Sequence, residues 1–139
     1  SAASDVYKRQ DNKGRLFIPA KLRDELGDVF YITLSMDDCL SVYSAESWKE
    51  FSDKVNAMSY IKQRKMRPLF AYAAKCELHN QGRTLIPAHL REYAHLSKNV
   101  AVIGCNNHAE IWDDERWQKL SESEITPENI ASVMDELEF

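Results

Sequence analysis

Asn12-Lys-Gly-Arg-Leu-Phe-Ile-Pro-Ala-Lys-Leu-Arg23 occurs a second time in the chain, as Asn80-Gln-Gly-Arg-Thr-Leu-Ile-Pro-Ala-His-Leu-Arg91. The two stretches lie at a constant offset of 68 residues, and eight of their twelve positions are identical. With one residue inserted, the segment 31–48 aligns with 100–117. The repeat therefore covers most of the 139 residues, and we expect two copies of one small folding unit.

The first half of each copy is expected to form a turn, a short strand and a short helix. The turns fall at Gly14 and Gly82, because glycine adopts positive φ without steric cost. Each turn is followed by a short apolar run that ends in proline, a residue favoured in the first turn of a helix. The helical period then buries the aliphatic side chains and turns Arg23 and Arg91 outward.

The second half of each copy is expected to form a β-hairpin and a further helix. β-Branched and aromatic runs are joined by polar turns at 36–38 and 106–108, a pattern typical of hairpins. Ser44, Asp113 and Thr126 are typical N-caps for the helices that follow. This order of elements predicts an α+β fold, mainly of strands with short helices.

The composition excludes several classes of protein. Hydrophobic residues at 44% and charged residues at 29% are typical of a globular protein. No apolar run reaches the roughly 18 residues of a membrane span, so we expect a cytoplasmic protein with no membrane partner. The three cysteines lie apart in apolar stretches and are expected to be reduced thiols: Cys39, Cys76 and Cys105.

The net charge of −4 hides an uneven distribution. Residues 1–70 carry 12 Lys and Arg against 10 Asp and Glu, whereas residues 71–139 carry 6 against 12. Most of the acid excess lies after residue 109 and can be kept away from a basic surface. An asymmetry of this kind favours a polyanionic partner such as nucleic acid.

Motifs for chemistry are missing from the sequence. It contains no nucleophile elbow, P-loop or dinucleotide fingerprint, so an enzyme is the least favoured class. The four histidines form no pair of the type His-x-x-x-His, and the cysteines form no Cys-x-x-Cys. We therefore expect no metal, no cofactor and no small-molecule ligand.

Residues 1–10 look foreign to the repeat. Their sequence resembles the in-frame translation of a transposon-based sequencing adapter. In the second copy the matching place is taken by 71–78, which is more apolar and reads as a credible strand. Our interpretation is that adapter-derived sequence replaces the first strand, and the alternative is a natural strand of polar composition.

The paired Gly-Arg and Ile-Pro-Ala-x-Leu-Arg blocks, with the segments 76–83 and 102–112, resemble the MraZ family over residues 11–139. The resemblance implies a duplicated AbrB/SpoVT-type swapped-hairpin β-barrel, pseudo-two-fold within one chain, with C-terminal helices. The expected organisation is a first repeat at 5–47, a helical linker at 48–70, a second repeat at 73–117 and an acidic helical tail at 118–139.

The resemblance also implies a function. It predicts a sequence-specific transcription regulator, associated with the nucleoid, that binds short direct repeats in double-stranded DNA as a ring-shaped homo-oligomer. Repression of its own promoter and of the division and cell-wall gene cluster is the expected effect. The alternative is a non-enzymatic protein-interaction or antitoxin-like module of the same fold, whose acidic C-terminal region binds a basic partner.

The family's Asp-x-x-x-Arg signature falls on Asp11 and Arg15, whereas the second copy has His79 and Arg83. A carboxylate can fix an arginine by a charge-assisted bond, and arginine suits both phosphate and guanine contacts. The side chains expected to bind DNA are Asp11, Lys13, Arg15, Lys21, Arg23 and Arg83.

Each expected contact has a structural alternative. Arg15 could serve only in an ion pair that orders the turn, and the lysines and Arg23 could be solvated charges. Arg83 and Arg91 could instead stabilise the fold or a subunit interface. The basic run at 62–67 is either a solvated helix face or a phosphate contact, and Pro68 is expected to end or kink the helix that carries it.

Overall fold

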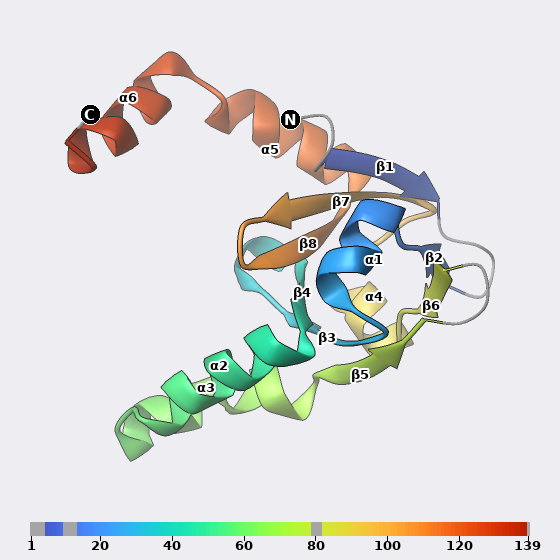
Figure 1. Cartoon of the computed structure of the whole chain (residues 1–139). Coiled ribbons are helices and arrows are strands. Elements are labelled where there is room, and N and C mark those ends of the chain that lie inside the picture. The colour runs from blue at the N-terminus through green and yellow to red at the C-terminus, as the bar shows by residue number, and fades with distance from the viewer. Residues whose placement is uncertain (1–4, 10–13, 79–81, 139) are drawn as a thin grey trace.

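The computed structural model describes residues 5–9, 14–78 and 82–138, with the side chains of 5–9 left out of the description (Figure 1). Strands and helices alternate through both copies of the repeat. In chain order the elements are β1 (Asp5–Arg9), β2 (Arg15–Phe17), α1 (Ala20–Leu26), β3 (Val29–Leu34), the 3-10 turn η1 (Met36–Asp38), β4 (Leu40–Ser44), α2 (Ala45–Asn56), α3 (Tyr60–Ala71), β5 (Ala74–Glu77), β6 (Arg83–Leu85), α4 (Ala88–Tyr93), β7 (Asn99–Cys105), β8 (His108–Asp113), α5 (Asp114–Glu124) and α6 (Pro127–Glu136).

The strands form one six-stranded sheet and one two-stranded ribbon, all antiparallel. The sheet has the order β1-β7-β8-β4-β3-β5, and the ribbon pairs β2 with β6. The first strand of each copy thus joins the hairpin of the other copy, since β1 pairs with β7 and β5 pairs with β3. The two copies therefore share one sheet and do not form separate domains.

The pairing register relates the two copies by a pseudo-two-fold axis. In the ribbon Leu16 lies opposite Thr84, and in the middle of the sheet Ser41 lies opposite Glu110. Each pair joins equivalent positions of the two copies, as an axis through the pair requires. Backbone bonds follow the same symmetry, because Ile18 donates to the carbonyl of Gly82 and Ile86 donates to that of Gly14.

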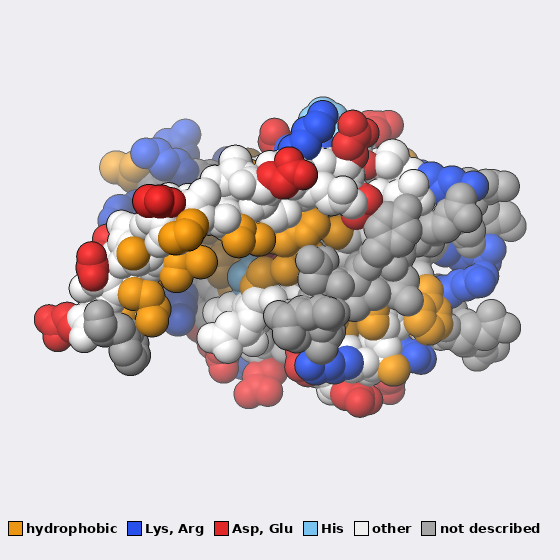
Figure 2. All heavy atoms as spheres, turned by 90° about the horizontal axis from the view of Figure 1, so that it is seen from above, with side chains coloured by type: hydrophobic (Ala, Val, Ile, Leu, Met, Phe, Trp, Pro, Cys, Tyr) orange, Lys and Arg blue, Asp and Glu red, His pale blue; other side chains and the backbone are white. Residues whose placement is uncertain are grey.

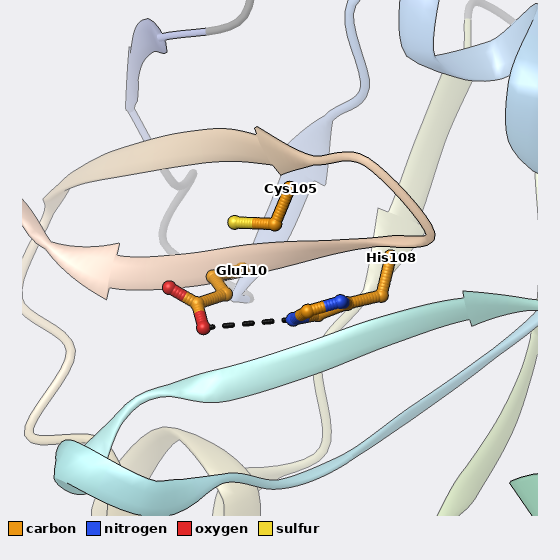
Figure 3. A group of neighbouring side chains, drawn as sticks. All are labelled: Cys105, His108 and Glu110. Atoms are coloured by element: carbon orange, nitrogen blue, oxygen red, sulfur yellow. Dashed lines mark ion pairs between the residues drawn. The ribbon is translucent and has the colours of Figure 1, made fainter. Parts of the chain in front are cut away.

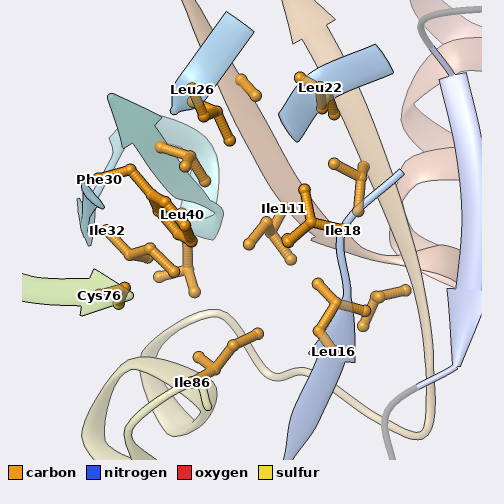
Figure 4. Close-up of a cluster of buried hydrophobic side chains, with 14 of the residues drawn as sticks. Leu16, Ile18, Leu22, Leu26, Phe30, Ile32, Leu40, Cys76, Ile86 and Ile111 are labelled. Atoms are coloured by element: carbon orange, nitrogen blue, oxygen red, sulfur yellow. The ribbon is translucent and has the colours of Figure 1, made fainter. Parts of the chain in front are cut away.

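The main core lies between the sheet, the ribbon and the short helices α1 and α4 (Figure 4). The apolar faces expected for the two short helices are confirmed, since their aliphatic side chains are buried. Cys76 joins this core from β5. The fully buried aliphatic and aromatic members include Leu16, Ile18, Phe30, Ile32, Leu40, Ile86, Leu90, Val100 and Ile111.

Helices cover the opposite face of the sheet. Trp48 of α2 stacks on Tyr31 with ring centroids 5.2 Å apart, and Phe70 of α3 packs on the same tryptophan. In the second copy, Trp117 of α5 packs against Trp112 of β8. Both copies therefore use tryptophans to attach their helices to the sheet.

The predicted helix starts are confirmed by side-chain caps. Ser44 accepts a hydrogen bond from the backbone of Ser47, Asp113 from that of Arg116, and Thr126 from that of Asn129. The end of a helix at Pro68, one of two expected outcomes, is wrong, because α3 runs through Pro68 to Ala71. The last turn is held by tertiary contacts of α3, among them a hydrogen bond from Thr33 to the carbonyl of Leu69.

The observed mixture of sheets and six α-helices confirms the α+β class among the described residues. The expectation of mainly strands with short helices is wrong, because helical residues outnumber strand residues in the described part of the chain. The predicted boundary at 47/48 falls inside α2, and the predicted boundary at 117/118 falls inside α5. All three cysteines are free thiols, as predicted, and Cys39 and Cys76 are buried. None of the helices described is both long enough and apolar enough to cross a membrane.

Candidate nucleic-acid interface

The β2–β6 ribbon separates its side chains into a buried and an outward face. Leu16 and Thr84 point into the core, with exposed fractions of 0% and 1%. Because side chains alternate along a strand, their neighbours point the other way. The outward face carries Arg15 and Phe17 from β2 and Arg83 and Leu85 from β6.

Two arginines therefore lie on one exposed surface of the ribbon. Arg83 is exposed and Arg15 is half-buried, and the register places them opposite Phe17 and Leu85, respectively. Lys21 is exposed on the neighbouring helix α1. The structure thus brings together two of the predicted DNA contacts, one from each copy of the repeat.

Arg23 and Arg91 occupy different positions from those predicted. A Cβ at Gly82 would lie 2.6 Å from a terminal nitrogen of Arg23, and a Cβ at Gly14 would lie 2.7 Å from Arg91 Nε. Each guanidinium therefore packs against the glycine turn of the other copy. The prediction that these arginines turn outward is wrong, because a long side chain can reach back from the exposed side of a short helix.

Further contacts hold these two arginines in place. Arg91 Nε donates to the carbonyl of Ile86 at 2.9 Å, and the guanidinium of Arg23 lies 5.1 Å from the ring centroid of Phe17. Both glycines have φ above 70°, a conformation that side chains other than glycine rarely adopt. A glycine in each turn is required both by its φ and by the arginine against it.

Asp11 and Lys13, which were expected to contact DNA, lie outside the described residues. So does His79, which replaces the aspartate of the family signature in the second copy. They immediately precede the two glycine turns in the sequence. The four cations of the run 62–67 are exposed on α3, well away from the ribbon (Figure 1).

The acidic C-terminal helices lie far from the ribbon. Figure 1 shows α6 at the opposite end of the molecule from β2 and β6. Helices α5 and α6 form a C-terminal arm. At its base, Arg116 of α5 donates hydrogen bonds to the backbone carbonyls of Asp38 and Ala94 at 2.7 and 3.2 Å. The carboxylates of α6 are thus separated from the outward face of the ribbon.

Comparison with known proteins identifies the family. The family described as "MraZ protein, putative antitoxin-like" matches twice, at residues 7–67 and 69–136. The chain belongs to the MraZ family. The two matches correspond to the two copies of the repeat, and membership confirms the prediction of a transcription regulator that is not an enzyme.

Several MraZ proteins cover most of this chain. The transcriptional regulator MraZ of Finegoldia magna is 38% identical over 98% of both chains. That of Heliobacterium modesticaldum is 46% identical over 81% of this chain and 80% of its own. That of Caldanaerobacter subterraneus subsp. tengcongensis is 43% identical over 90% of both.

The sequence did not lead us to predict one cluster of possible metal ligands in this MraZ chain. Cys105, His108 and Glu110 gather at the β7–β8 turn, with one potential ligand atom from each within 4.8 Å of the others. The three residues follow the mixed spacing Cys-x-x-His-x-Glu, which differs from the paired spacings Cys-x-x-Cys and His-x-x-x-His. A two-residue hairpin turn between the cysteine and the histidine was the signal that could have revealed it.

Proposed function

We propose that the chain binds double-stranded DNA sequence-specifically through the outward face of the β2–β6 ribbon. The observation that carries the proposal is the placement of Arg15 and Arg83 on the exposed side of a ribbon whose other side is buried. The major groove admits a two-stranded ribbon, and arginine can bond guanine in a bidentate manner. The pseudo-two-fold axis would present one such arginine from each copy.

The residues around the ribbon would add to this surface. Lys21, which is exposed on α1, would contact a phosphate. We assign the same role to Lys13, and to Asp11 the role of orienting Arg15. Arg23 was expected among the DNA contacts, but its packing against Gly82 supports a different role. It would hold the loop of the second copy in the shape that DNA binding requires.

The chain would act as a homo-oligomer. Figure 2 shows hydrophobic side chains gathered along the arm of C-terminal helices, bordered by acidic ones. Isolated exposed helices with such a face are unstable in water, so a second copy would cover it. A ring of chains would present several ribbons at once, and weak contacts would then sum through multivalency. The exposed members are Ile125, Ile130, Val133, Met134 and Leu137.

The remaining parts of the proposal follow from the family resemblance. The strand exchange between the copies would be the swapped-hairpin arrangement of the AbrB/SpoVT group. The regulator would bind short direct repeats upstream of its own gene and of the division and cell-wall cluster, mainly as a repressor. It would work in the cytoplasm, in association with the nucleoid.

A second candidate is a protein-interaction module that resembles antitoxins. Two observations favour it: the family description contains the term, and the C-terminal arm is acidic and apolar. Such an arm could bind a basic protein partner and not a second copy. The proposal of DNA binding and this alternative make opposite predictions for a titration with DNA alone.

The test is a titration of labelled DNA from upstream of the gene, with a scrambled duplex as control, at several salt concentrations. We expect preference for the upstream DNA and a linear fall of the logarithm of affinity with that of salt concentration. Equal, weak binding to both duplexes would contradict the proposal and favour the protein-interaction module.

A further inference from the structure

The β7–β8 hairpin places Cys105, His108 and Glu110 on one face. Cys105 lies directly opposite His108 in the antiparallel ladder, and residues in such a pair point to the same side. Glu110 follows His108 by two residues and therefore shares that side. Figure 3 shows the three side chains converging from the two strands beside the turn.

Neighbouring groups turn one atom of His108 and one atom of Glu110 toward each other at the centre of the cluster. The Nδ1 atom of His108 lies 2.8 Å from the side-chain oxygen of Asn107, so Nε2 is the nitrogen left toward Glu110. The Oε1 atom of Glu110 accepts a hydrogen bond from the indole of Trp112 at 2.9 Å, which leaves Oε2. These two atoms are 3.6 Å apart and form an ion pair when His108 is protonated (Figure 3), so a metal ion would replace their contact with each other.

We propose that this cluster is a binding site for a zinc-type divalent cation, held by Cys105 Sγ, His108 Nε2 and Glu110 Oε2. Thiolate, imidazole and carboxylate are the ligands that zinc takes in proteins, at about 2.0–2.3 Å. Tetrahedral bonds of that length put ligand atoms about 3.4–3.7 Å apart, so the observed spacing within 4.8 Å needs only small side-chain adjustments.

The charges and the exposure of the cluster fit such an ion. One thiolate and one carboxylate balance the two positive charges, while His108 binds as neutral imidazole. The side chains of His108 and Glu110 are 24% and 22% exposed, which shelters the site and still lets an ion enter. The hydrogen bond to Asn107 is the kind of outer contact that fixes a ligating histidine. Three protein ligands leave a fourth position for water.

Binding must displace a proton from the thiol. An ordinary cysteine thiol has a pKa of about 8.5 and is mostly protonated at neutral pH. The proton of Cys105 therefore passes to solvent when the sulfur–metal bond forms. The step involves no oxidation, and the affinity should rise with pH.

The site belongs to the second copy alone. The strand pairing places Ser35, Cys39 and Ser41 of the first copy in the three equivalent positions. These side chains do not form an equivalent ligand set, since the serine hydroxyl is a weak ligand for zinc. The expected stoichiometry is therefore one ion per chain.

The experiment titrates the full, untagged chain with Zn²⁺ alone, after removal of metal with a chelator. Calorimetry in two buffers of different ionisation enthalpy gives both the stoichiometry and the protons released. We expect one ion and about one proton per chain near neutral pH, and a higher melting temperature with zinc. Co²⁺ in place of Zn²⁺ should give a thiolate-to-cobalt charge-transfer band.

Single substitutions separate this site from incidental binding. Cys105→Ser should remove the charge-transfer band and the proton release, and His108→Gln should weaken binding at least tenfold. His89→Gln is the matched control, because His89 is an exposed histidine on α4 outside the cluster, and it should change nothing. If a variant fails to fold by circular dichroism, Glu110→Gln takes its place, with tenfold weaker binding expected. No saturable binding, or equal binding by all variants, would overturn the proposal.

Discussion

Replacing Gly14 with alanine tests how Arg91 supports the turn in front of the ribbon. Gly14 has a φ of 77°, and a Cβ built on it would lie 2.7 Å from both Nε and Cζ of Arg91. Real Cβ atoms do not approach other atoms so closely, so the guanidinium must move. It then loses its 2.9 Å hydrogen bond to the carbonyl of Ile86.

Two effects add to the loss of stability in Gly14→Ala. An alanine at this positive φ costs about 1–2 kcal/mol. Loss of a hydrogen bond from a charged donor costs about 1.5–3 kcal/mol when buried, and about 1–2 kcal/mol is reasonable for the half-buried Arg91. The free energy of unfolding should therefore fall by about 2–4 kcal/mol, a large part of the 5–15 kcal/mol that is typical of a small protein.

A double-mutant cycle in urea isolates the contact from the backbone effect. The cycle compares Gly14→Ala, Arg91→Ala and the double variant. In the Arg91→Ala background, Gly14→Ala should cost only its backbone strain, which leaves a coupling energy of about 1–2 kcal/mol. Additive effects within about 0.5 kcal/mol would refute the role of Arg91 in supporting this turn.

Three further predictions follow from burial and strand pairing. Leu16→Ala on the buried side of the ribbon should lower the free energy of unfolding by about 2–5 kcal/mol, whereas Leu85→Ala, at a residue that is 48% exposed, should lower it by less than about 1 kcal/mol. Equal losses in urea denaturation would contradict the assignment of the buried and outward faces of the ribbon. Burial raises the pKa of the Cys39 thiol to about 12 from 9.0, so the protonated thiol stabilises the folded chain fully below about pH 9, and this stabilisation is lost as pH rises through 12. The free energy of unfolding should therefore fall between these pH values by up to about 1.4 kcal/mol per pH unit. The fall should be less steep in Cys39→Ala. Replacing residues 1–10 with an alternating apolar strand should raise the melting temperature and strengthen DNA binding, and unchanged values would show that β1 tolerates its present sequence.

The local elements were predictable because their signals lie within a few residues. Ser44, Asp113 and Thr126 each precede a helix, and the structure shows each one as a cap. Helical spacing likewise identified the buried side chains of the short helices. The helix through Pro68 was harder to foresee, because aromatic packing beyond the local sequence holds its last turn.

The site was less accessible to sequence reasoning than the fold. Neither the pairing of β2 with β6 nor the reach of Arg23 to Gly82 is encoded in local periodicity, because both join residues far apart in the chain. The ion-binding cluster depends on a two-residue turn that sets Cys105 opposite His108. A slip of one residue in the pairing register would move the two side chains to opposite faces of the hairpin.

DNA affinity of Arg15→Ala combined with Arg83→Ala tests the central proposal most directly. Each lost base contact should cost about 1–3 kcal/mol, so fluorescence anisotropy with upstream DNA should show at least a tenfold weaker affinity, with Arg15→Ala the larger single effect. Lys119→Ala is the control, because Lys119 is 75% exposed on α5 and lies outside the ribbon. We expect the double variant to stay folded by circular dichroism and to lose its preference for the upstream DNA. An unchanged preference in a folded double variant would contradict it.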